Sequence, residues 1–341
     1  MKLQKLIKPI AGLTLGMTLS AAALAETTMR VASWLPPTHP QNAVVLDTWG
    51  KWIDEATEGR VKMVVEYGMG HPKSLFDLVE DGVADASWSV HGYIPGRFKL
   101  TEAVELPNLN ASAEAASVAL WRVNEKYFKQ ANEHEGLQLA ALFTHGPGQI
   151  HLAKPIKSLE ELKGRKIRLG GGIQGALGER MEITPVGAPA PKVYEMMQQG
   201  VVDGVFISAS EQKAQRLSEV TKQLVLLPGG MYTMSFSMFL NPDFMEGLSE
   251  ADQQAIMSVS GEKLSALAGR AWDAGDIEGL KAARDAGVSI VEVKPGDPMD
   301  QEFKSMVKGM DEEYLERVAD RGVDAEAALK ELREIARSYK P

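Results

Sequence analysis

Two stretches of the chain repeat one pattern of hydrophobic and polar positions. Residues 75–88 and 193–206 match in chemical class along a continuous register, and each contains a Gly-Val-x-Asp sequence, at Gly82–Asp85 and Gly200–Asp203. Each stretch predicts a helix with an apolar stripe, a glycine at its C-terminal cap and then a short buried strand. A unit that occurs twice predicts two similar α/β lobes with a cleft between them. The alternative is that the match is a coincidence, because a helix–Gly–Val–strand connection is common in α/β proteins.

The rest of the pattern extends this α/β arrangement. Short apolar runs predict strands at residues 29–34, 61–67, 84–88, 137–144, 150–153, 166–169, 184–187, 202–207, 232–240 and 288–293. Apolar residues at helical spacing predict helices at residues 41–57, 74–81, 112–135, 174–182, 249–286, 301–321 and 325–339. The segment 249–286 is far longer than a typical globular helix, so we expect it to span both lobes, with glycines that weaken or bend it.

A break at His145–Gly148 marks the expected crossing between the lobes, and the predicted strand 232–240 returns to the first lobe. The expected division is lobe I at residues 26–148 and about 235–265, and lobe II at residues 149–234 and about 266–341, with the C-terminal helices packed on the outside. Because no low-complexity linker separates the lobes, we expect hinge strands to connect them.

The N-terminus has the pattern of a secretory signal peptide. Lys2, Lys5 and Lys8 form a basic region, an apolar run follows, and Ala23–Ala25 is a small-x-small cleavage site. We expect export and removal of residues 1–25, with no stable membrane insertion afterwards. An uncleaved anchor is the less favoured alternative, because the apolar run is short and interrupted by glycine and serine.

Composition narrows the classes of function. The sequence has no cysteine, which excludes disulfides, thiolate nucleophiles, thiolate metal sites and iron–sulfur clusters. The net charge is −9 and the acidic residues are spread along the chain. Because no basic stripe is present, we expect no binding to nucleic acid.

Arg168 is the first candidate for a functional residue. It lies in the predicted strand 166–169, and Gly170–Gly172 and a predicted helix follow it. Ligands of open α/β sheets bind beyond the carboxyl ends of strands, where a guanidinium can hold a carboxylate through two hydrogen bonds. The alternative is a solvated surface cation like its neighbours. Residues 170–175 also match G-x-G-x-x-G, but too late in the chain to favour a dinucleotide site, so no cofactor is expected.

Aromatic residues gather at the ends of predicted strands. Trp34 and Trp88 end strands of one lobe and are expected to stack on a ligand; the other aromatic candidates are Tyr93 and Phe206, with Tyr232 and Phe236 near a crossing. Core packing is the ordinary alternative for such residues. His39 and His91 are candidate hydrogen-bonding partners of a ligand. The histidines lack tight metal-binding spacing, and the chain has no nucleophile elbow, EF-hand loop or P-loop, so no metal is expected.

Several motifs resemble those of the solute-binding subunits of tripartite ATP-independent periplasmic (TRAP) transporters, of the DctP type. They are Ala32–Pro40, Pro95–Phe98, Leu106-Pro107, Lys163–Arg168, Thr184-Pro185, Val193-Tyr194 and Gly200–Gly204, and the similarity covers nearly the whole mature chain. The resemblance implies a two-lobed periplasmic binding protein fold with a long helix across both lobes, which closes around a small organic anion. It also implies that Arg168 is the carboxylate-binding arginine.

Two departures from this family pattern affect the expected ligand. Sialic-acid-type members carry a second arginine where this chain has Gly148, so a second carboxylate clamp is not expected. Other members place Asn, or a Glu–Trp pair that helps to hold a metal, after the Asp-Gly turn. This chain has Phe206-Ile207-Ser208 there, so Ile207 joins the candidate ligand contacts and a metal-bridged ligand is disfavoured.

The sequence therefore predicts a periplasmic binding protein and not an enzyme. We expect it to capture a small organic acid, more specifically a monocarboxylate, and to deliver it to the membrane permease subunits of a TRAP transporter. Two alternatives use the same cleft. One is a secreted α/β enzyme, for which the sequence shows no convincing nucleophile–base pair or metal cluster, and the other is a ligand-sensing subunit that serves a membrane receptor.

Overall fold

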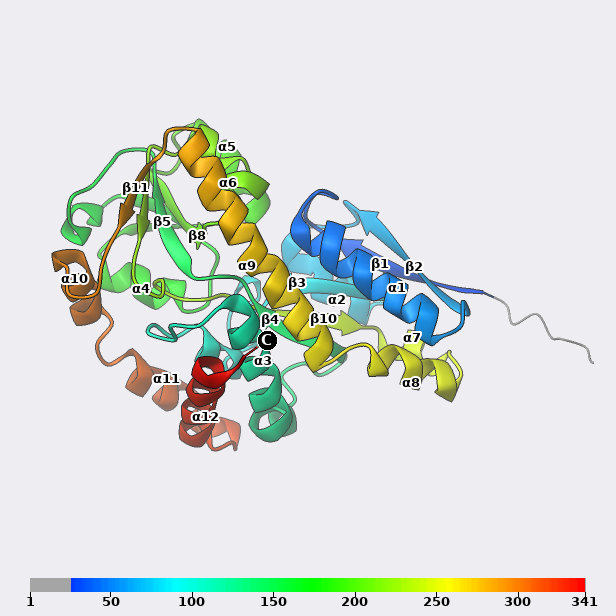
Figure 1. Ribbon diagram of the computed structural model, residues 1–341. Helices are drawn as coiled ribbons and strands as arrows, with labels where there is room; N and C mark the ends of the chain where they lie inside the picture. Colours follow the sequence, from blue (N-terminus) through cyan, green and yellow to red (C-terminus); the bar gives the residue numbers. More distant parts are fainter. Residues whose placement is uncertain (1–25, 341) are drawn as a thin grey trace, which may run out of the picture.

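Two β-sheets organise residues 26–340, the part of the chain that the computed structural model describes (Figure 1). The first sheet has the order β2-β1-β3-β10-β4, formed by β1 (Thr27–Ser33), β2 (Val61–Tyr67), β3 (Ala86–Val90), β4 (Gln138–Thr144) and β10 (Ser235–Leu240). The second has the order β11-β9-β5-β8-β6-β7, formed by β5 (Gly148–Leu152), β6 (Lys166–Leu169), β7 (Thr184–Gly187), β8 (Gly204–Ser208), β9 (Gln223–Leu226) and β11 (Ser289–Glu292). The predicted two-lobed α/β fold is confirmed. The predicted signal peptide, residues 1–25, lies outside the described residues.

Helices surround both sheets, and one of them crosses from lobe to lobe (Figure 1). The helices near the first sheet include α1 (Asp47–Ala56), α2 (Leu75–Glu80), α3 (Ala113–Val123), α7 (Pro242–Glu246) and α8 (Glu250–Ser258). The helices α4 (Gln174–Arg180), α5 (Val193–Gln198) and α6 (Glu211–Ala214) follow strands of the second sheet. After α8 the chain continues with α9 (Glu262–Asp285), α10 (Pro298–Met306), α11 (Met310–Val318) and α12 (Ala325–Ser338). A π-helical segment at Gln41–Leu46 leads into α1.

The predicted internal repeat is confirmed by the sheet topology. In the first sheet β2 and β3 flank β1 on either side and run parallel to it. In the second sheet β7 and β8 flank β6 in the same parallel arrangement. An antiparallel strand then joins each unit, β10 beside β3 and β5 beside β8. The two lobes therefore share one arrangement of five strands, and β6, which carries Arg168, corresponds to β1.

The aspartates of the two Gly-Val-x-Asp sequences have the same structural role. The carboxylate of Asp85 accepts a hydrogen bond from the backbone N–H of Arg30 at 2.7 Å, and that of Asp203 accepts one from the backbone N–H of Lys166 at 2.9 Å. Each aspartate thus binds the backbone of the neighbouring parallel strand, at the middle of β1 and at the start of β6. Strands β3 and β8 begin just after these bonds, two residues later than predicted.

Helix α9 ties the two lobes together. The Asp273 carboxylate accepts hydrogen bonds from the first two N–H groups of α3, and Asp276 Oδ1 accepts one from the N–H of Ser210 in the second lobe at 2.7 Å. The predicted helix 249–286 is wrong as a single helix. It is divided into α8 and α9 at Gly261, whose φ of 67° and ψ of −139° are not helical. The helix across both lobes is confirmed, and its internal glycines permit close packing instead of breaking it.

The end of the chain differs from its predicted course. The predicted helix 301–321 is two helices, α10 and α11, separated at Gly309, which has a φ of 87°. Helix α12, which we expected in lobe II, packs against α3 and the short helical segment Leu100–Val104. The division of the chain into lobes at the stated boundaries stays a prediction.

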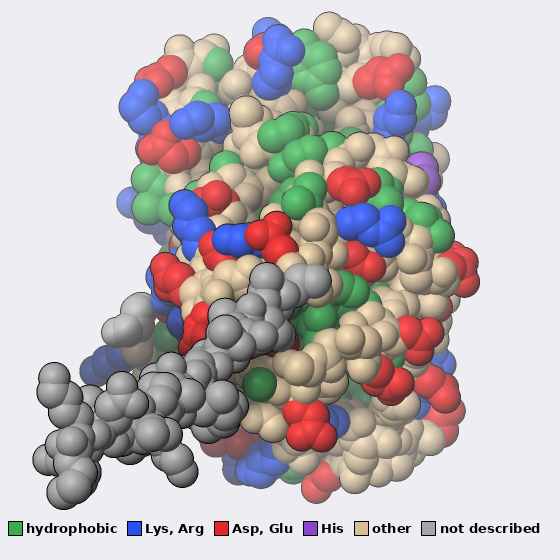
Figure 2. Space-filling view, turned by 90° about the vertical axis from the view of Figure 1, so that its right-hand side faces the viewer, with side chains coloured by type: hydrophobic (Ala, Val, Ile, Leu, Met, Phe, Trp, Pro, Cys, Tyr) green, Lys and Arg blue, Asp and Glu red, His purple; other side chains and the backbone are tan. Residues whose placement is uncertain are grey.

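Charged side chains of both signs cover the surface. On the face shown in Figure 2, Lys and Arg side chains are interspersed with Asp and Glu, and hydrophobic side chains form small groups between them. Among residues 26–340, no helix combines the length and the apolar character that a membrane span requires.

The close packing of α9 on the second lobe generates a stability prediction. A Cβ added at Gly279 would lie 2.0 Å from the carbonyl oxygen of Ala209, so Gly279→Ala should destabilise the protein by about 1–3 kcal/mol although alanine favours helices. At Gly175 in α4 no atom lies within 4 Å of an added Cβ, so Gly175→Ala should be neutral or stabilising by up to about 1 kcal/mol. Urea unfolding of both variants measures the difference. Equal free energies of unfolding would contradict the packing argument.

Candidate functional site

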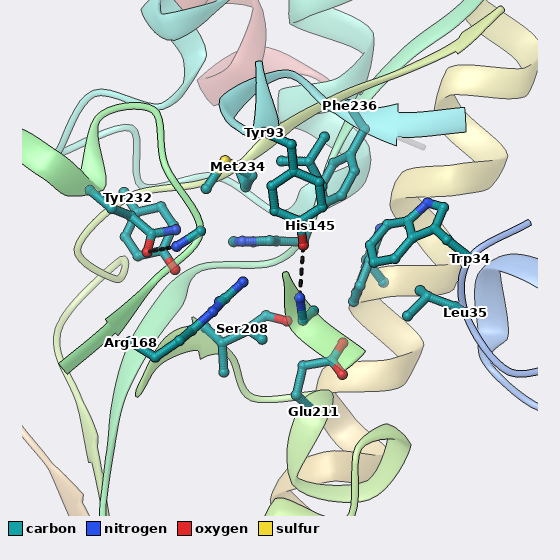
Figure 3. Close-up of a pocket in the computed structure, with 16 residues that line it drawn as sticks. Trp34, Leu35, Tyr93, His145, Arg168, Ser208, Glu211, Tyr232, Met234 and Phe236 are labelled. Atoms are coloured by element: carbon teal, nitrogen blue, oxygen red, sulfur yellow. Dashed lines mark hydrogen bonds between the residues drawn. The ribbon is translucent and has the colours of Figure 1, made fainter. Parts of the chain in front are cut away.

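A cavity lies between the lobes, where strands of both sheets end (Figure 3). Its walls come from the carboxyl ends of β1 and β3 in the first lobe, from those of β6 and β8 in the second, and from the crossing segment 232–236 and helix α9. This is the edge at which open α/β sheets bind ligands. Between the lining atoms lies about 400 Å³ of space, part of it open to solvent, and only about 30 Å³ of it can hold the centre of a water molecule.

Arg168 reaches this cavity from strand β6. Its side chain is almost completely buried, with only 2% of the residue exposed, and its Nε donates a hydrogen bond to the carbonyl of Ala188 at 2.8 Å. Among residues 26–340 no carboxylate oxygen lies within 4.0 Å of its guanidinium. The alternative of a solvated surface cation is therefore wrong. A buried cation without a partner is unfavourable, and its planar fork suits a bidentate anionic group.

Aromatic rings form much of the cavity wall. Trp34 lies at the cavity, where its Nε1 donates a hydrogen bond to the carbonyl of Trp88 at 2.9 Å and its ring lies 5.8 Å from that of Tyr93. Phe236 and Trp272 also line the cavity and stack on each other, with centroids 5.9 Å apart. These rings offer a flat apolar surface beside a single guanidinium.

Of the residues proposed from the sequence, the structure brings Arg168, Trp34, Tyr93 and Ile207 to the cavity, together with Tyr232 and Phe236, which were noted near a crossing. Trp88 and Phe206 are fully buried in the core and do not line it. Trp88 lies behind Trp34, with centroids 4.8 Å apart. Phe206 precedes Ile207 in strand β8, and neighbouring residues of a strand point to opposite faces.

The two candidate histidines also lie behind the cavity wall. His91 is buried, and its ring nitrogens lie 3.0 Å from Ser235 Oγ and 3.1 Å from His134 Nε2. Burial holds the pKa of His91 well below its ordinary value, so the ring is neutral at neutral pH. His39 lies behind Glu211, with its Nε2 3.4 Å from Glu211 Oε1. Neither histidine lines the cavity.

The ring of Tyr232 packs directly on Gly148, the position where some family members carry a second arginine. A Cβ added at Gly148 would lie 2.3 Å from the ring of Tyr232, so this ring occupies the space that any larger residue at position 148 would need. The Tyr232 hydroxyl is buried and has no hydrogen-bond partner within the described part of the chain. Burial raises the pKa of Tyr232, and the nearby Arg168 charge only partly opposes this effect. The phenol therefore stays protonated and can donate a hydrogen bond to an anion.

The two lobes touch beside the cavity. Tyr93 accepts a hydrogen bond from the N–H of Ala190 at 2.8 Å, and Glu105 Oε2 accepts one from the N–H of Ile173 at 3.1 Å. Burial raises the pKa of Glu105 to about 7. Gly171 approaches Gly92 so closely that a Cβ on it would lie 2.1 Å from the Gly92 carbonyl oxygen. The cavity is thus bounded by direct contact between the lobes.

Sequence reasoning missed several lining residues, among them His145, Gln174, Glu211 and Trp272. Glu211 lies just beyond β8, and Trp272 lies within α9, where helical spacing gives no sign of a cavity. Burial lowers the pKa of His145 to about 4, so it faces the cavity as a neutral ring. Within residues 26–340, no three His, Asp or Glu side chains are grouped as metal ligands.

Comparison with known proteins places this site in a known family. Residues 31–317 match the DctP family, described as bacterial extracellular solute-binding protein, family 7. Outer membrane transporter protein TsaT of Comamonas testosteroni is 30% identical over 312 residues, which is 91% of each chain. The ectoine-binding periplasmic protein TeaA of Halomonas elongata is 27% identical, over 59% of this chain and 58% of its own.

Solved structures give the same result. A TRAP periplasmic solute-binding protein of Bordetella bronchiseptica, with bound (R)- and (S)-mandelate, matches with a TM-score of 0.88 and 34% identity over 91% of this chain and 99% of its own. A marine metagenome TRAP protein specific for aromatic acids, with 3-hydroxybenzoate, matches with a TM-score of 0.85 and 32% identity over 93% and 100%. A Rhodoferax ferrireducens protein in complex with copurified benzoate matches with a TM-score of 0.84 and 28% identity over 91% and 98%. The chain therefore belongs to the DctP family of extracellular solute-binding proteins of TRAP transporters, and it is a solute receptor and not an enzyme.

Proposed function

We propose that this protein binds a small aromatic monocarboxylate between its lobes, with the carboxylate on Arg168. The observation that carries the proposal is the buried guanidinium, which faces an aromatic cavity and has no carboxylate partner among residues 26–340. The ligands of the relatives support the class, since mandelate, 3-hydroxybenzoate and benzoate each combine one carboxylate with one ring.

The carboxylate end of the cavity is built for a single anionic group. Arg168 is the one arginine or lysine among the lining residues, and the ring of Tyr232 fills the place beside Gly148 where a second arginine would stand. The free Tyr232 hydroxyl adds a neutral donor to the charged guanidinium. Exclusion of water strengthens these charge-assisted hydrogen bonds, because the local dielectric constant falls.

The ring of the ligand packs against the aromatic wall. Trp34, Phe236 and Trp272 line the cavity and provide flat apolar surface. Trp88, expected from the sequence as a direct contact, supports Trp34 from behind: its ring packs against that of Trp34, and its backbone carbonyl accepts the Trp34 Nε1 hydrogen bond. Burial of apolar surface contributes roughly 25 cal/mol per Å², so a shielded aromatic ring adds about 2–3 kcal/mol to binding.

Transport is the proposed use of this binding. After removal of residues 1–25 the mature protein acts in the periplasm, and the ligand-bound form with closed lobes docks on the membrane permease. Ligand preference for the closed form drives closure, by no more than its differential affinity for the two forms. Family membership supports transport over a sensing role, which would use the same cavity with another membrane partner.

Loss of the guanidinium should weaken binding strongly. Arg168→Ala removes the charge that pairs with the carboxylate, and we expect the Kd for benzoate or mandelate to rise at least tenfold, which corresponds to about 1.4 kcal/mol. Isothermal titration calorimetry measures the change. Lys166→Ala is the control, because Lys166 lies in the same strand but is exposed, and it should leave the Kd within about twofold. An unchanged affinity in Arg168→Ala would remove the proposed role of this residue.

Closure of the lobes should depend on Gly171. Alanine at this position would collide with the Gly92 carbonyl across the lobe contact, so Gly171→Ala should favour an open form and weaken binding about tenfold or more. Small-angle X-ray scattering should then show less compaction on addition of the ligand. Gly164→Ala is the matched control, because Gly164 also has a positive φ but no atom lies within 4 Å of an added Cβ. Equal binding by both variants would contradict the role of this contact.

A further inference from the structure

Glu211 places a carboxyl group in the cavity, apart from Arg168. Figure 3 shows its carboxylate on the side of the cavity where Trp34 and Leu35 lie, away from the Arg168 guanidinium. The side chain is only 3% exposed, and no lysine or arginine nitrogen within residues 26–340 lies within 4.0 Å of it. Its position follows from the chain, because Glu211 begins the short helix α6 directly after the end of β8.

The contacts of Glu211 hold one oxygen and leave the other free. Oε1 lies 3.4 Å from His39 Nε2 and 3.5 Å from Ser210 Oγ. His39 Nδ1 accepts a hydrogen bond from the N–H of Gln41, which leaves the proton of the neutral ring on Nε2, directed at Glu211. Oε2 is buried and has no hydrogen-bond partner in the described part of the chain.

An unpartnered buried carboxylate oxygen requires an explanation. Buried polar groups in native proteins are nearly always hydrogen-bonded, and leaving one unpaired costs roughly 1–3 kcal/mol or more when it is charged. The nearby wall adds a second such atom, because Trp272 Nε1 is also buried without a partner. His39 links the two residues, since its ring lies 5.2 Å from that of Trp272 and its Nε2 contacts Glu211. Both residues line the cavity, so a group bound there is placed to pair with these atoms.

We propose that Glu211 Oε2 accepts a hydrogen bond from a hydroxyl group on the part of the ligand remote from its carboxylate. This inference rests on the proposed function and narrows it to hydroxyl-bearing aromatic monocarboxylates. Glu211 is then a specificity residue, and His39 is a positioning residue that fixes its Oε1. A ligand without a hydroxyl leaves Oε2 unpaired, and rejection of such analogues follows from the cost of that unpaired group.

The test compares ligands that differ only in this hydroxyl. Calorimetry measures the Kd of benzoate, of its three monohydroxy isomers and of the methoxy analogue of the best isomer, which keeps the oxygen but lacks the donor. With the wild-type protein we expect the best hydroxybenzoate to bind about tenfold more tightly than benzoate, and the methoxy analogue to lose this advantage. In Glu211→Ala the advantage should fall to about twofold or less, with a smaller change in benzoate affinity.

Controls separate this inference from the proposed function. Glu219→Ala removes one exposed acid of the second lobe that does not line the cavity, and it should keep the full hydroxyl preference. Glu211→Gln keeps one acceptor oxygen and the shape of the side chain, so it should retain part of the preference and reports on Glu211 if the alanine variant does not fold. A hydroxyl preference that is absent in the wild type, or unchanged in Glu211→Ala, would overturn the inference while benzoate binding through Arg168 stands. Failure of every aromatic acid to bind would instead overturn the proposed function.

Discussion

The buried guanidinium of Arg168 is the interaction on which the site depends. Strand β6 brings it to the cavity, the carbonyl of Ala188 accepts a hydrogen bond from its Nε, and no carboxylate oxygen of residues 26–340 lies within 4.0 Å of it. A protein interior tolerates such a charge only when something compensates for it. The surrounding aromatic residues shield this charge from water.

The scaffold that presents this charge is duplicated, and the long helix α9 joins its halves. Asp273 on α9 caps the start of α3, while Asp276, one helical turn later, binds the backbone of Ser210 in the other lobe. Burial raises the pKa of Asp276 to about 7, which reflects how closely the helix packs at this junction. Glycines on the same helix let the backbones of both lobes approach it.

Much of the fold could be predicted from the sequence, because it depends on local pattern. The repeat, most of the elements and the position of Arg168 at a strand end follow from periodicity and from Gly-rich turns, but strand β9 was not predicted. The expected carboxylate-binding role of Arg168 came from the family resemblance and not from the pattern. What the sequence could not show depends on which way a side chain points and what faces it. Trp34 follows the end of β1 and reaches the cavity, whereas Trp88, which was predicted to end a strand, lies in the middle of β3 and is buried. Glu211 was missed because its burial arises only when the two lobes and α9 enclose it. Gly261 looked like its neighbours in an apparent helix, although its backbone ends one helix and begins the next.

The pairing of Gly148 with Tyr232 has a consequence for how this receptor could change its ligand. Because the tyrosine ring occupies the volume above the glycine, a basic side chain at position 148 fits only after the ring is removed. Removal of the ring alone would leave a gap in the cavity wall and remove the phenol hydroxyl as a hydrogen-bond donor, with no new contact in its place. A basic side chain at position 148 would therefore involve a change at both positions, and either substitution alone passes through a less well packed wall.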